Sequence, residues 1–376
     1  MIYTCLALSD CFSKIITGEW GTESDEEIGT PVIRTTNFTN SGKIDYSKVA
    51  FRNIEPKKVA EKALKAGDII LEKSGGTDNT PVGRVVYCER EIEEQPFLCN
   101  NFTQAMRPNL DVVYPKYIFY TLFFLHQSGE TDLMQNKTTG IRNLRVKDYL
   151  SRIIHLPSID EQEAIVLKID KTRDIMSWRN HQIEVLDLIV KSRFVEMFGD
   201  PVTNPMGWKI VKWNDLFNTT TGKLDSNAMV GNGDYPFFTC AKEVFSIDKY
   251  AFDCEALLLA GNNASAIYDV KHYIGKFNAY QRTYVITLKS SEYSYHPFKL
   301  MLEQKLEKMR ELSKGTNTKY LTMGILNDFD FVVPPLDLQN RFADFVRAAD
   351  KSKVEIQQGL KSLELQYNAL MQKYFG

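Results

Sequence analysis

The chain repeats a segment of its own sequence at a fixed distance. IIHLPSIDEQEAIVLKID, at residues 153–170, recurs as DFVVPPLDLQNRFADFVR at residues 330–347, which is an offset of 177 residues. The same offset places Phe198-Gly199 on Phe375-Gly376, and no gap is needed from Pro157 to Gly199. A register kept over this length indicates that one structural unit has been built twice.

Both copies show the apolar period of long helices that pack in pairs. Alternate steps of four and three residues pass through mostly apolar positions, which together form a seam along each helix. In the first copy the seam comprises Ile165, Ile169, Thr172, Met176, Arg179, Ile183, Leu186, Val190, Arg193 and Met197. In the second copy it comprises Phe342, Val346, Ala349, Lys353, Ile356, Leu360, Leu363, Tyr367, Leu370 and Tyr374. These seams predict a coiled coil, although a stripe of this kind is also typical of ordinary core packing.

The ends of both helices carry start and stop signals. Ser158 and Glu161 form a capping-box pattern, and Asp337 is the expected N-cap of the second helix. Gly199, which precedes Asp-Pro, is the expected stop of the first helix. Each helix then spans about 38 residues, or about 57 Å at the α-helical rise. With one helix after each globular part, the two can bury their seams against each other in an antiparallel pair with pseudo-two-fold symmetry.

Two irregular parts remain outside the helices. Both are rich in β-branched and aromatic runs broken by Gly, Asn and Asp, as at residues 67–72 and 283–288. We therefore expect an α+β protein, in which two mixed α/β domains are separated by two long helices that form an antiparallel coiled coil. The expected boundaries are 1–152 and 208–329 for the domains, and 153–207 and 330–376 for the helical segments.

Composition and charge limit the class of protein. Hydrophobic residues make up 43% of the chain and charged residues 25%, as in globular proteins. No apolar run is long enough to span a membrane, and the N-terminus does not read as a signal peptide. The scattered 6 Cys and 5 His predict no metal site and favour free thiols in the cytoplasm. The net charge of −2 argues against indiscriminate binding of nucleic acid, so any DNA binding must come from local basic surfaces.

Several phrases of the sequence are similar to those of one protein family. KSRFVEMFGDP at residues 191–201 and PPLDLQNRFADFV at residues 334–346 resemble segments of type I restriction–modification specificity subunits, usually called HsdS. GKFNAYQRTYV at residues 275–285 also resembles this family, and GDIILEKSGG at residues 67–76 does so more loosely. The resemblance covers essentially the whole chain, including the repeat.

The resemblance implies a DNA-binding protein without a catalytic site of its own. Two target-recognition domains would each read one half of a bipartite, asymmetric site in double-stranded DNA, and the paired helices would set the gap. The implied partners are two adenine methyltransferase subunits and, optionally, two restriction subunits. S-adenosylmethionine, ATP and magnesium would belong to those partners, and this chain would hold no cofactor. A rod of about 57 Å exceeds one DNA turn of about 34–36 Å, which suits two readers in separate major grooves.

Two basic loops that precede the helices are the first candidates for contact with DNA. They share basic and hydroxyl side chains, which bind phosphates and base edges, so we interpret them as a pair of phosphate clamps. A solvated turn that leads into a strand is the alternative. The first loop contributes Lys137, Thr138, Thr139, Arg142 and Arg145, and its counterpart at the same offset contributes Lys314, Thr316 and Lys319.

A third stretch, residues 271–289, interleaves basic and aromatic residues and contains no acidic residue. Such a composition is typical of a nucleic-acid surface, although its tyrosines are equally suited to the core of a strand. The candidates from this stretch are Lys276, Asn278, Gln281 and Arg282. Weaker candidates from the first domain are Arg34, Lys73 and Arg84.

Two alternatives remain beside DNA recognition. One is a nuclease, since Asp68 and Glu72-Lys73 resemble a carboxylate–lysine cluster, but Glu and Lys are adjacent where one intervening residue is expected. The sequence also lacks an amino-methyltransferase motif and a P-loop, so catalysis by this chain alone is not favoured. The other alternative is a structural adaptor, or an inactive remnant, that mediates protein–protein contacts without reading DNA.

Overall fold

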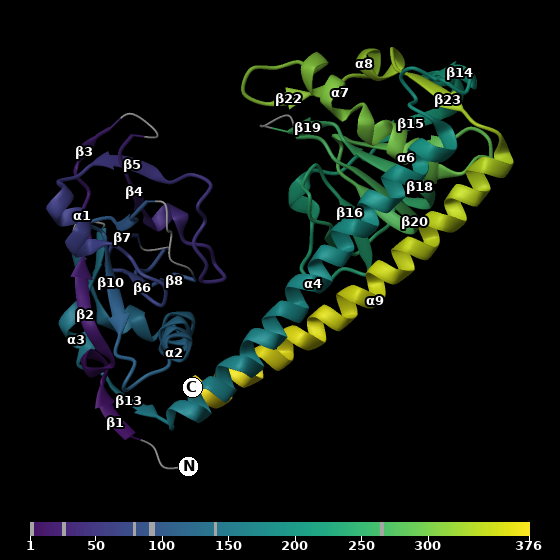
Figure 1. Ribbon diagram of the computed structural model, residues 1–376. Helices are drawn as coiled ribbons and strands as arrows, with labels where there is room; N and C mark the ends of the chain where they lie inside the picture. The colour runs from purple at the N-terminus through teal and green to yellow at the C-terminus, as the bar shows by residue number, and fades with distance from the viewer. Residues whose placement is uncertain (1–3, 25–27, 78–79, 90–94, 139–140, 264–266) are drawn as a thin grey trace. The chain divides into compact units, whose positions relative to one another are not determined.

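The structure is a computed structural model that describes residues 4–24, 28–77, 80–89, 95–138, 141–263 and 267–376. The chain divides into two compact units. Unit 1 consists of Met1–Trp178 and Leu360–Gly376, and unit 2 consists of Arg179–Gly359. The long helix α4 (Ile159–Phe198) begins in unit 1 and ends in unit 2, whereas α9 (Leu336–Phe375) begins in unit 2 and ends in unit 1 (Figure 1).

Besides the helix segments, unit 1 consists of short strands and short helices. Its strands are β1 (Thr4–Ala7), β2 (Phe12–Thr17), β3 (Thr22–Glu23), β4 (Thr30–Ile33), β5 (Ala50–Asn53), β6 (Ile69–Glu72), β7 (Ser74–Gly76), β8 (Val85–Tyr87), β9 (Leu98–Cys99), β10 (Thr103–Pro108), β11 (Gln135–Thr138), β12 (Ile141–Leu144) and β13 (Ile153–Leu156). Its helices are η1 (Leu8–Cys11), η2 (Thr35–Asn37), α1 (Pro56–Lys62), α2 (Pro115–Gln127), η3 (Glu130–Met134) and α3 (Val146–Leu150). The sheets have the strand orders β2-β10-β6-β8, β3-β5-β4-β9, β11-β12-β7 and β1-β13.

Unit 2 is organised around one larger sheet with the strand order β15-β21-β18-β20-β16-β17. Two further pairs, β14-β23 and β19-β22, complete the unit. Its strands are β14 (Lys209–Lys212), β15 (Phe217–Thr221), β16 (Tyr235–Phe238), β17 (Phe245–Ile247), β18 (Phe252–Ala260), β19 (Asn262–Asn263), β20 (Val270–Ala279), β21 (Thr283–Leu288), β22 (Lys319–Tyr320) and β23 (Asp330–Val333). Its helices are α5 (Trp213–Leu216), η4 (Ser226–Ala228), α6 (Tyr295–Gln304), α7 (Leu306–Leu312) and α8 (Met323–Asn327).

The two units repeat one arrangement of strands. In each unit the strand nearest its start pairs with the strand that precedes the long helix, as β1 with β13 and β14 with β23. A central strand, β6 or β18, pairs antiparallel with β10 or β21. Both central strands contain an apolar run, at residues 69–71 of β6 and 256–260 of β18, because both faces are buried there: Leu257 and Leu259 of β18 lie in one core, and Leu258 lies in another. The prediction of a mixed fold built twice is therefore confirmed.

The predicted pair of helices is also confirmed. α4 and α9 have 40 residues each, and their ends are related by the offset found in the sequence. All predicted seam residues are buried or half-buried except Arg179, which is exposed. Within unit 2, Phe198 near the end of α4 contacts Phe342 near the start of α9, with ring centroids 5.3 Å apart. Within unit 1, Ile165 near the start of α4 shares a core with Met371 near the end of α9, so the helices run antiparallel.

One of the two predicted N-caps is correct and the other is wrong. The Oγ of Ser158 accepts a hydrogen bond from the Glu161 amide, and the Glu161 carboxylate accepts one from the Ser158 amide, both at 3.4 Å, so the expected capping box is formed. Asp337 is not an N-cap, because α9 begins at Leu336 and places Asp337 in its first turn. Pro335 stands where the first copy has Ser158, and proline has no side-chain acceptor. At the other end, Gly199 has a φ of +72° and stops α4 as predicted.

A buried glutamine fastens each long helix to the unit in which it begins. The Oε1 of Gln162 accepts a hydrogen bond from the Tyr114 amide at 2.8 Å, and its Nε2 donates to the Pro157 carbonyl at 2.9 Å. In unit 2, Gln339 makes the corresponding pair of bonds, with the Ser294 amide at 3.1 Å and the Pro334 carbonyl at 2.8 Å. Both glutamine side chains are fully buried, so the same polar contact recurs in both copies.

Candidate nucleic-acid interface

The first basic loop of unit 1 forms a β-hairpin. β11 and β12 pair antiparallel, and the register sets Lys137 opposite Arg142. β12 also pairs with β7, where Arg142 lies opposite Gly76 and Asn143 opposite Ser74. The structure thus brings Lys73, Arg142 and the Ser-Gly-Gly segment of β7 to one edge of the unit, although the sequence analysis treated them as separate candidates. Thr139 lies outside the described residues.

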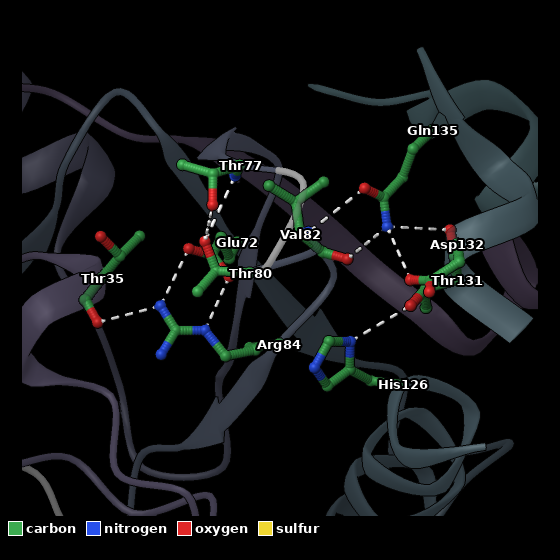
Figure 2. A network of polar contacts seen from close by, with 10 residues as sticks. All are labelled: Thr35, Glu72, Thr77, Thr80, Val82, Arg84, His126, Thr131, Asp132 and Gln135. Carbon is green, nitrogen blue, oxygen red and sulfur yellow. Dashed lines mark hydrogen bonds and ion pairs between the residues drawn. The ribbon is translucent and has the colours of Figure 1, made fainter. Parts of the chain in front are cut away.

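Gln135 fixes the base of this hairpin to the rest of unit 1. Its Nε2 donates to the Val82 carbonyl at 3.1 Å and to the Asp132 carboxylate at 3.1 Å, as Figure 2 shows. Close by, the Nδ1 of His126 lies 3.1 Å from the Oγ1 of Thr131, and burial lowers the pKa of this histidine. The hairpin is therefore held by side-chain hydrogen bonds of Gln135 at its base and not only by the pairing of its strands.

The corresponding loop of unit 2 forms a shorter hairpin. The backbones of Lys314 and Tyr320 exchange two hydrogen bonds, of 3.0 and 2.8 Å. Lys319 lies opposite Asn263 in the pairing of β22 with β19. Among the described residues, the ammonium groups of Lys314 and Lys319 have no hydrogen-bond or ion-pair partner, and Thr316 is exposed. The offset predicted two corresponding basic loops before the long helices, and each of them forms a hairpin. Their contact with DNA stays a prediction.

A tight turn lies beside the hairpin in unit 1. The turn covers residues 100–102, and the Thr103 amide closes it with a hydrogen bond to the Asn100 carbonyl at 3.0 Å. The Phe102 carbonyl accepts the Lys73 amide at 2.9 Å, which joins the turn to the start of β7. The Lys73 carbonyl in turn accepts the Leu144 amide at the end of β12, at 2.8 Å. Turn, β7 and hairpin therefore form one connected surface, which we call the basic edge of unit 1.

Unit 2 repeats these contacts residue for residue. The Thr283 amide closes the turn of residues 280–282 with a hydrogen bond to the Tyr280 carbonyl at 2.8 Å. The Arg282 carbonyl accepts the Gly261 amide at 2.8 Å, and the Gly261 carbonyl accepts the Leu321 amide at 2.8 Å. We call the surface formed by this turn, β19 and the 314–320 hairpin the basic edge of unit 2. Its backbone matches that of unit 1, but its side chains differ.

The third predicted stretch is divided by the structure. Gln281 and Arg282 are exposed in the turn of the basic edge, where the Nε2 of Gln281 lies 3.5 Å from the Asp225 carboxylate. Asn278 is buried, and its Nδ2 donates to the Lys249 carbonyl at 2.9 Å, so its amide serves the interior of the unit. Lys276 is exposed on β20, and its ammonium lies 4.7 Å from the centre of the Tyr250 ring.

Two arginines proposed as weaker candidates are engaged within unit 1. The guanidinium of Arg84 forms two hydrogen bonds with the Glu72 carboxylate, at 2.8 and 2.9 Å, and a third with the Thr35 carbonyl at 3.3 Å (Figure 2). The hydrogen bond with Glu72 raises the pKa of Arg84. The Nη2 of Arg34 donates to the Lys48 carbonyl at 3.0 Å, so both guanidinium groups help to shape the unit.

Arg145 lies at the end of the hairpin of unit 1. Its Nη2 donates to the Leu133 carbonyl at 2.7 Å, and its Nε lies 3.2 Å from the Asp148 carboxylate. These contacts fix the segment between β12 and α3. They also leave less of this guanidinium available to a ligand than at Arg282, whose guanidinium has no hydrogen-bond or ion-pair partner among the described residues.

The carboxylates of the suspected nuclease cluster are both occupied. Asp68 is fully buried and accepts hydrogen bonds from Arg107 at 2.8 and 2.7 Å and from the Lys65 amide at 2.8 Å. Glu72 is bound by Arg84, as described above. Within the described ranges, no cluster of His, Cys, Asp and Glu is suited to a metal ion. These groups act in the fold, and nothing in their geometry favours hydrolysis.

Several residues of the two basic edges were missed by the sequence analysis. Phe102 and Tyr320 are exposed, at 47% and 38%, beside the basic side chains. Asn262 and Asn263, which form β19 and pair with β22, were not among the predicted candidates. The signal for Phe102 was its position just before Thr103, because Thr103 and Thr283 begin equivalent strands. The offset of this correspondence, 180 residues, differs from the 177 residues that relate the two helices, so the helix repeat does not reveal it.

The sequence and its fold are similar to those of known proteins. Residues 23–186 and 205–365 match the family described as the type I restriction modification DNA specificity domain, once for each copy of the repeat. These ranges cover most of the chain. The chain belongs to this family.

Two curated relatives match parts of this chain. The EcoDI type I restriction enzyme specificity subunit of Escherichia coli is 41% identical over 142 residues, which are 37% of this chain and 30% of that protein. A relative from Methanocaldococcus jannaschii is 24% identical over 193 residues, which are 51% of this chain and 44% of that protein. The chain thus matches less than half the length of either relative.

Two solved structures resemble the fold over its full length. The S subunit of a type I restriction–modification system from M. genitalium has a TM-score of 0.62 at 15% identity, and covers 100% of this chain and 96% of its own. The second structure is titled as a study of complex assembly and conformational transition of the type I R-M system. It has a TM-score of 0.55 at 15% identity, and covers 99% of this chain and 97% of its own. The predicted family and fold class are confirmed. In the described part of the chain, no helix is long and apolar enough to cross a membrane.

Proposed function

We propose that the chain is the DNA-reading specificity subunit of a type I restriction–modification complex. The observation that carries this proposal is the basic edge, which is built twice on one backbone frame with different side chains. The basic side chains on each edge are suited to contacts with phosphates. The other side chains differ between the two edges, so each edge is suited to the recognition of different bases. Two unlike edges in one chain are what a bipartite, asymmetric site in double-stranded DNA requires.

The proposal assigns a task to each part of the chain. Residues 1–152 and 208–329 are the target-recognition domains, and the helical segments 153–207 and 330–376 join and space them. The contacts with DNA are assigned to the two edges, whereas Arg34, Arg84, Arg145 and Asn278 support the loops that make them. The contacts assigned to the edges are Lys73, Lys137, Thr138, Thr139, Arg142, Gln281, Arg282, Lys314, Thr316 and Lys319, and Lys276 of β20 is assigned a further contact outside them.

Partners and cofactors follow from the same proposal. The chain docks two adenine methyltransferase subunits and, in complexes that cleave DNA, two restriction subunits, all in the cytoplasm. S-adenosylmethionine, ATP and magnesium bind to those partners, and this chain carries no catalytic site. The engagement of Asp68 and Glu72 by arginines supports this division of tasks, because neither carboxylate is available to hold a metal ion.

Salt dependence of binding separates this proposal from a structural adaptor. The test uses the complex of the chain with its methyltransferase subunits and a duplex that carries a site methylated in the host. A reader that neutralises phosphates loses affinity steeply as salt rises, by about 10³-fold or more between 50 and 200 mM salt for six or more contacts. Affinity that is weak and independent of salt contradicts the proposal and favours the adaptor.

A further inference from the structure

The last residue of the turn occupies the same place in both units but has opposite chemistry. Residue 102 of unit 1 and residue 282 of unit 2 each precede the strand that pairs with the central strand. Each offers its carbonyl to the residue that follows the central strand, Lys73 or Gly261. Their backbones are therefore equivalent, whereas the side chains are a phenylalanine and an arginine.

Both side chains project from a fixed backbone. The Phe102 carbonyl accepts hydrogen bonds from two successive amides, Lys73 at 2.9 Å and Ser74 at 3.2 Å. Its ring is 47% exposed and lies over Gly75, whose φ of +96° is a conformation that favours glycine. Arg282 is held by the Gly261 amide, and its guanidinium is exposed without a partner among the described residues. A side chain on a fixed backbone can select a ligand with a smaller loss of conformational freedom on binding.

The neighbours of both positions carry positive charge. Lys73 and Arg142 accompany Phe102 on the basic edge of unit 1, and Lys314 and Lys319 accompany Arg282 on that of unit 2. On the proposed function, these basic neighbours contact the phosphate backbone and leave residues 102 and 282 to meet a groove of the duplex. An exposed phenylalanine alone is ordinary on a protein surface, but this one lies on the same edge as two basic residues.

We propose that residues 102 and 282 determine the base specificity of the two half-sites. This inference rests on the proposed function. Arg282 reads a guanine in the major groove, because its planar fork donates two hydrogen bonds to O6 and N7, a geometry that lysine cannot supply. Phe102 has no donor and reads an A·T pair through apolar contact with the thymine methyl group. One half-site therefore contains a G·C pair, and the other an A·T pair, at the position that faces this turn.

The proposal is tested by sequencing methylated adenines in cells that carry the methyltransferase with the wild-type chain, with Arg282→Lys or with Phe102→Ala. Arg282→Lys keeps the charge and removes the fork, and we expect the preference for guanine to fall roughly tenfold or more at one position of one half-site. Phe102→Ala is expected to relax one position of the other half-site only. Matched controls are Arg310→Lys, an exposed arginine on α7, and Leu110→Ala, which is 69% exposed beyond the opposite end of β10; both should leave the motif unchanged.

The outcomes separate this inference from the proposed function. If the wild-type chain directs methylation to a bipartite motif and both variants keep every position of it, the inference is wrong and the proposed function stands. If both variants relax the same half-site, the assignment of one turn to each half is wrong. If the wild-type chain directs no motif, the proposed function itself fails. Assembly of each variant with the methyltransferase, measured by size-exclusion chromatography, shows that a changed motif does not come from misfolding.

Discussion

Glu72 and Arg84 illustrate how a charged residue in a recognition domain can serve the fold. The Glu72 side chain is 6% exposed, and the Arg84 guanidinium covers it with two hydrogen bonds. Arg84→Ala would leave a buried carboxylate without its cation, which is strongly destabilising in a fully buried pair. Because Arg84 is 36% exposed, we expect a smaller loss of about 2–3 kcal/mol in the free energy of unfolding.

Urea denaturation of the purified chain measures this loss, with Lys57→Ala as the control. Lys57 is exposed on α1, and its removal should change the free energy of unfolding by less than about 0.5 kcal/mol. If Arg84→Ala instead leaves stability unchanged and weakens DNA binding, Arg84 is a contact residue and its structural assignment is wrong.

The buried glutamine at the start of α9 gives a second prediction for a single residue. Gln339→Ala removes one hydrogen bond to the Ser294 amide and one to the Pro334 carbonyl, and both backbone groups lose their partner. We expect a loss of about 1–3 kcal/mol in the free energy of unfolding. Gln358→Ala, at an exposed position of the same helix, is the matched control. Equal stability of the two variants would contradict the role assigned to Gln339.

His296 gives unit 2 a dependence on pH. Burial, assisted by the nearby His272 and Arg347, lowers the pKa of His296 from 6.5 to about 4. The folded chain therefore binds fewer protons than the unfolded chain between these values, so stability is retained above pH 6.5 and falls as the pH drops toward 4. We expect His296→Gln to reduce the loss of unfolding free energy between pH 7 and pH 5. His181→Gln, at an exposed position on α4, should leave that loss as in the wild type.

The positive charge of the hairpin of unit 2 can be tested directly for its contribution to DNA binding. Lys314 and Lys319 are the basic residues of this hairpin, and neither ammonium has a partner within the described ranges. Each phosphate contact adds about one unit to the slope of log affinity against log salt. We expect the double variant Lys314→Ala, Lys319→Ala to lower this slope by about two in the complex with methyltransferase. Lys308→Ala, paired with Glu311 on α7, should leave the slope unchanged, and an unchanged slope in the double variant would remove the hairpin from the interface.

At the scale of elements, the helices were predictable and the turns were not. The seam of α9 repeats an apolar residue every three or four positions, and that period is visible without any tertiary information. The turn at residues 100–102 has no such period. Its place beside Lys73 depends on the pairing of β10 with β6, and these strands are separated by a long stretch of sequence. Long-range pairing of this kind cannot be read from local patterns.

The whole molecule is a duplication whose two copies have kept a backbone and changed its side chains. The side chains of Gln162 and Gln339 make equivalent hydrogen bonds in the two copies. The backbones of Lys73 and Gly261 also make equivalent hydrogen bonds, although their side chains have nothing in common. The sequence revealed the copies through their helices, because packing of the seam restricts those residues to apolar types. It could not reveal which loop residues meet at the basic edges, since backbone hydrogen bonds that assemble the edges place no constraint on residue type.

The central claim is that this chain chooses the DNA sequence at which its partners act. Sequencing of methylated adenines, in cells with the methyltransferase subunit and with or without the chain, tests that claim most directly. We expect methylation at one bipartite, asymmetric motif when the chain is present, and loss of that motif when it is absent. Methylation that is the same in both strains, or that follows no bipartite motif in the strain with the chain, would contradict the account.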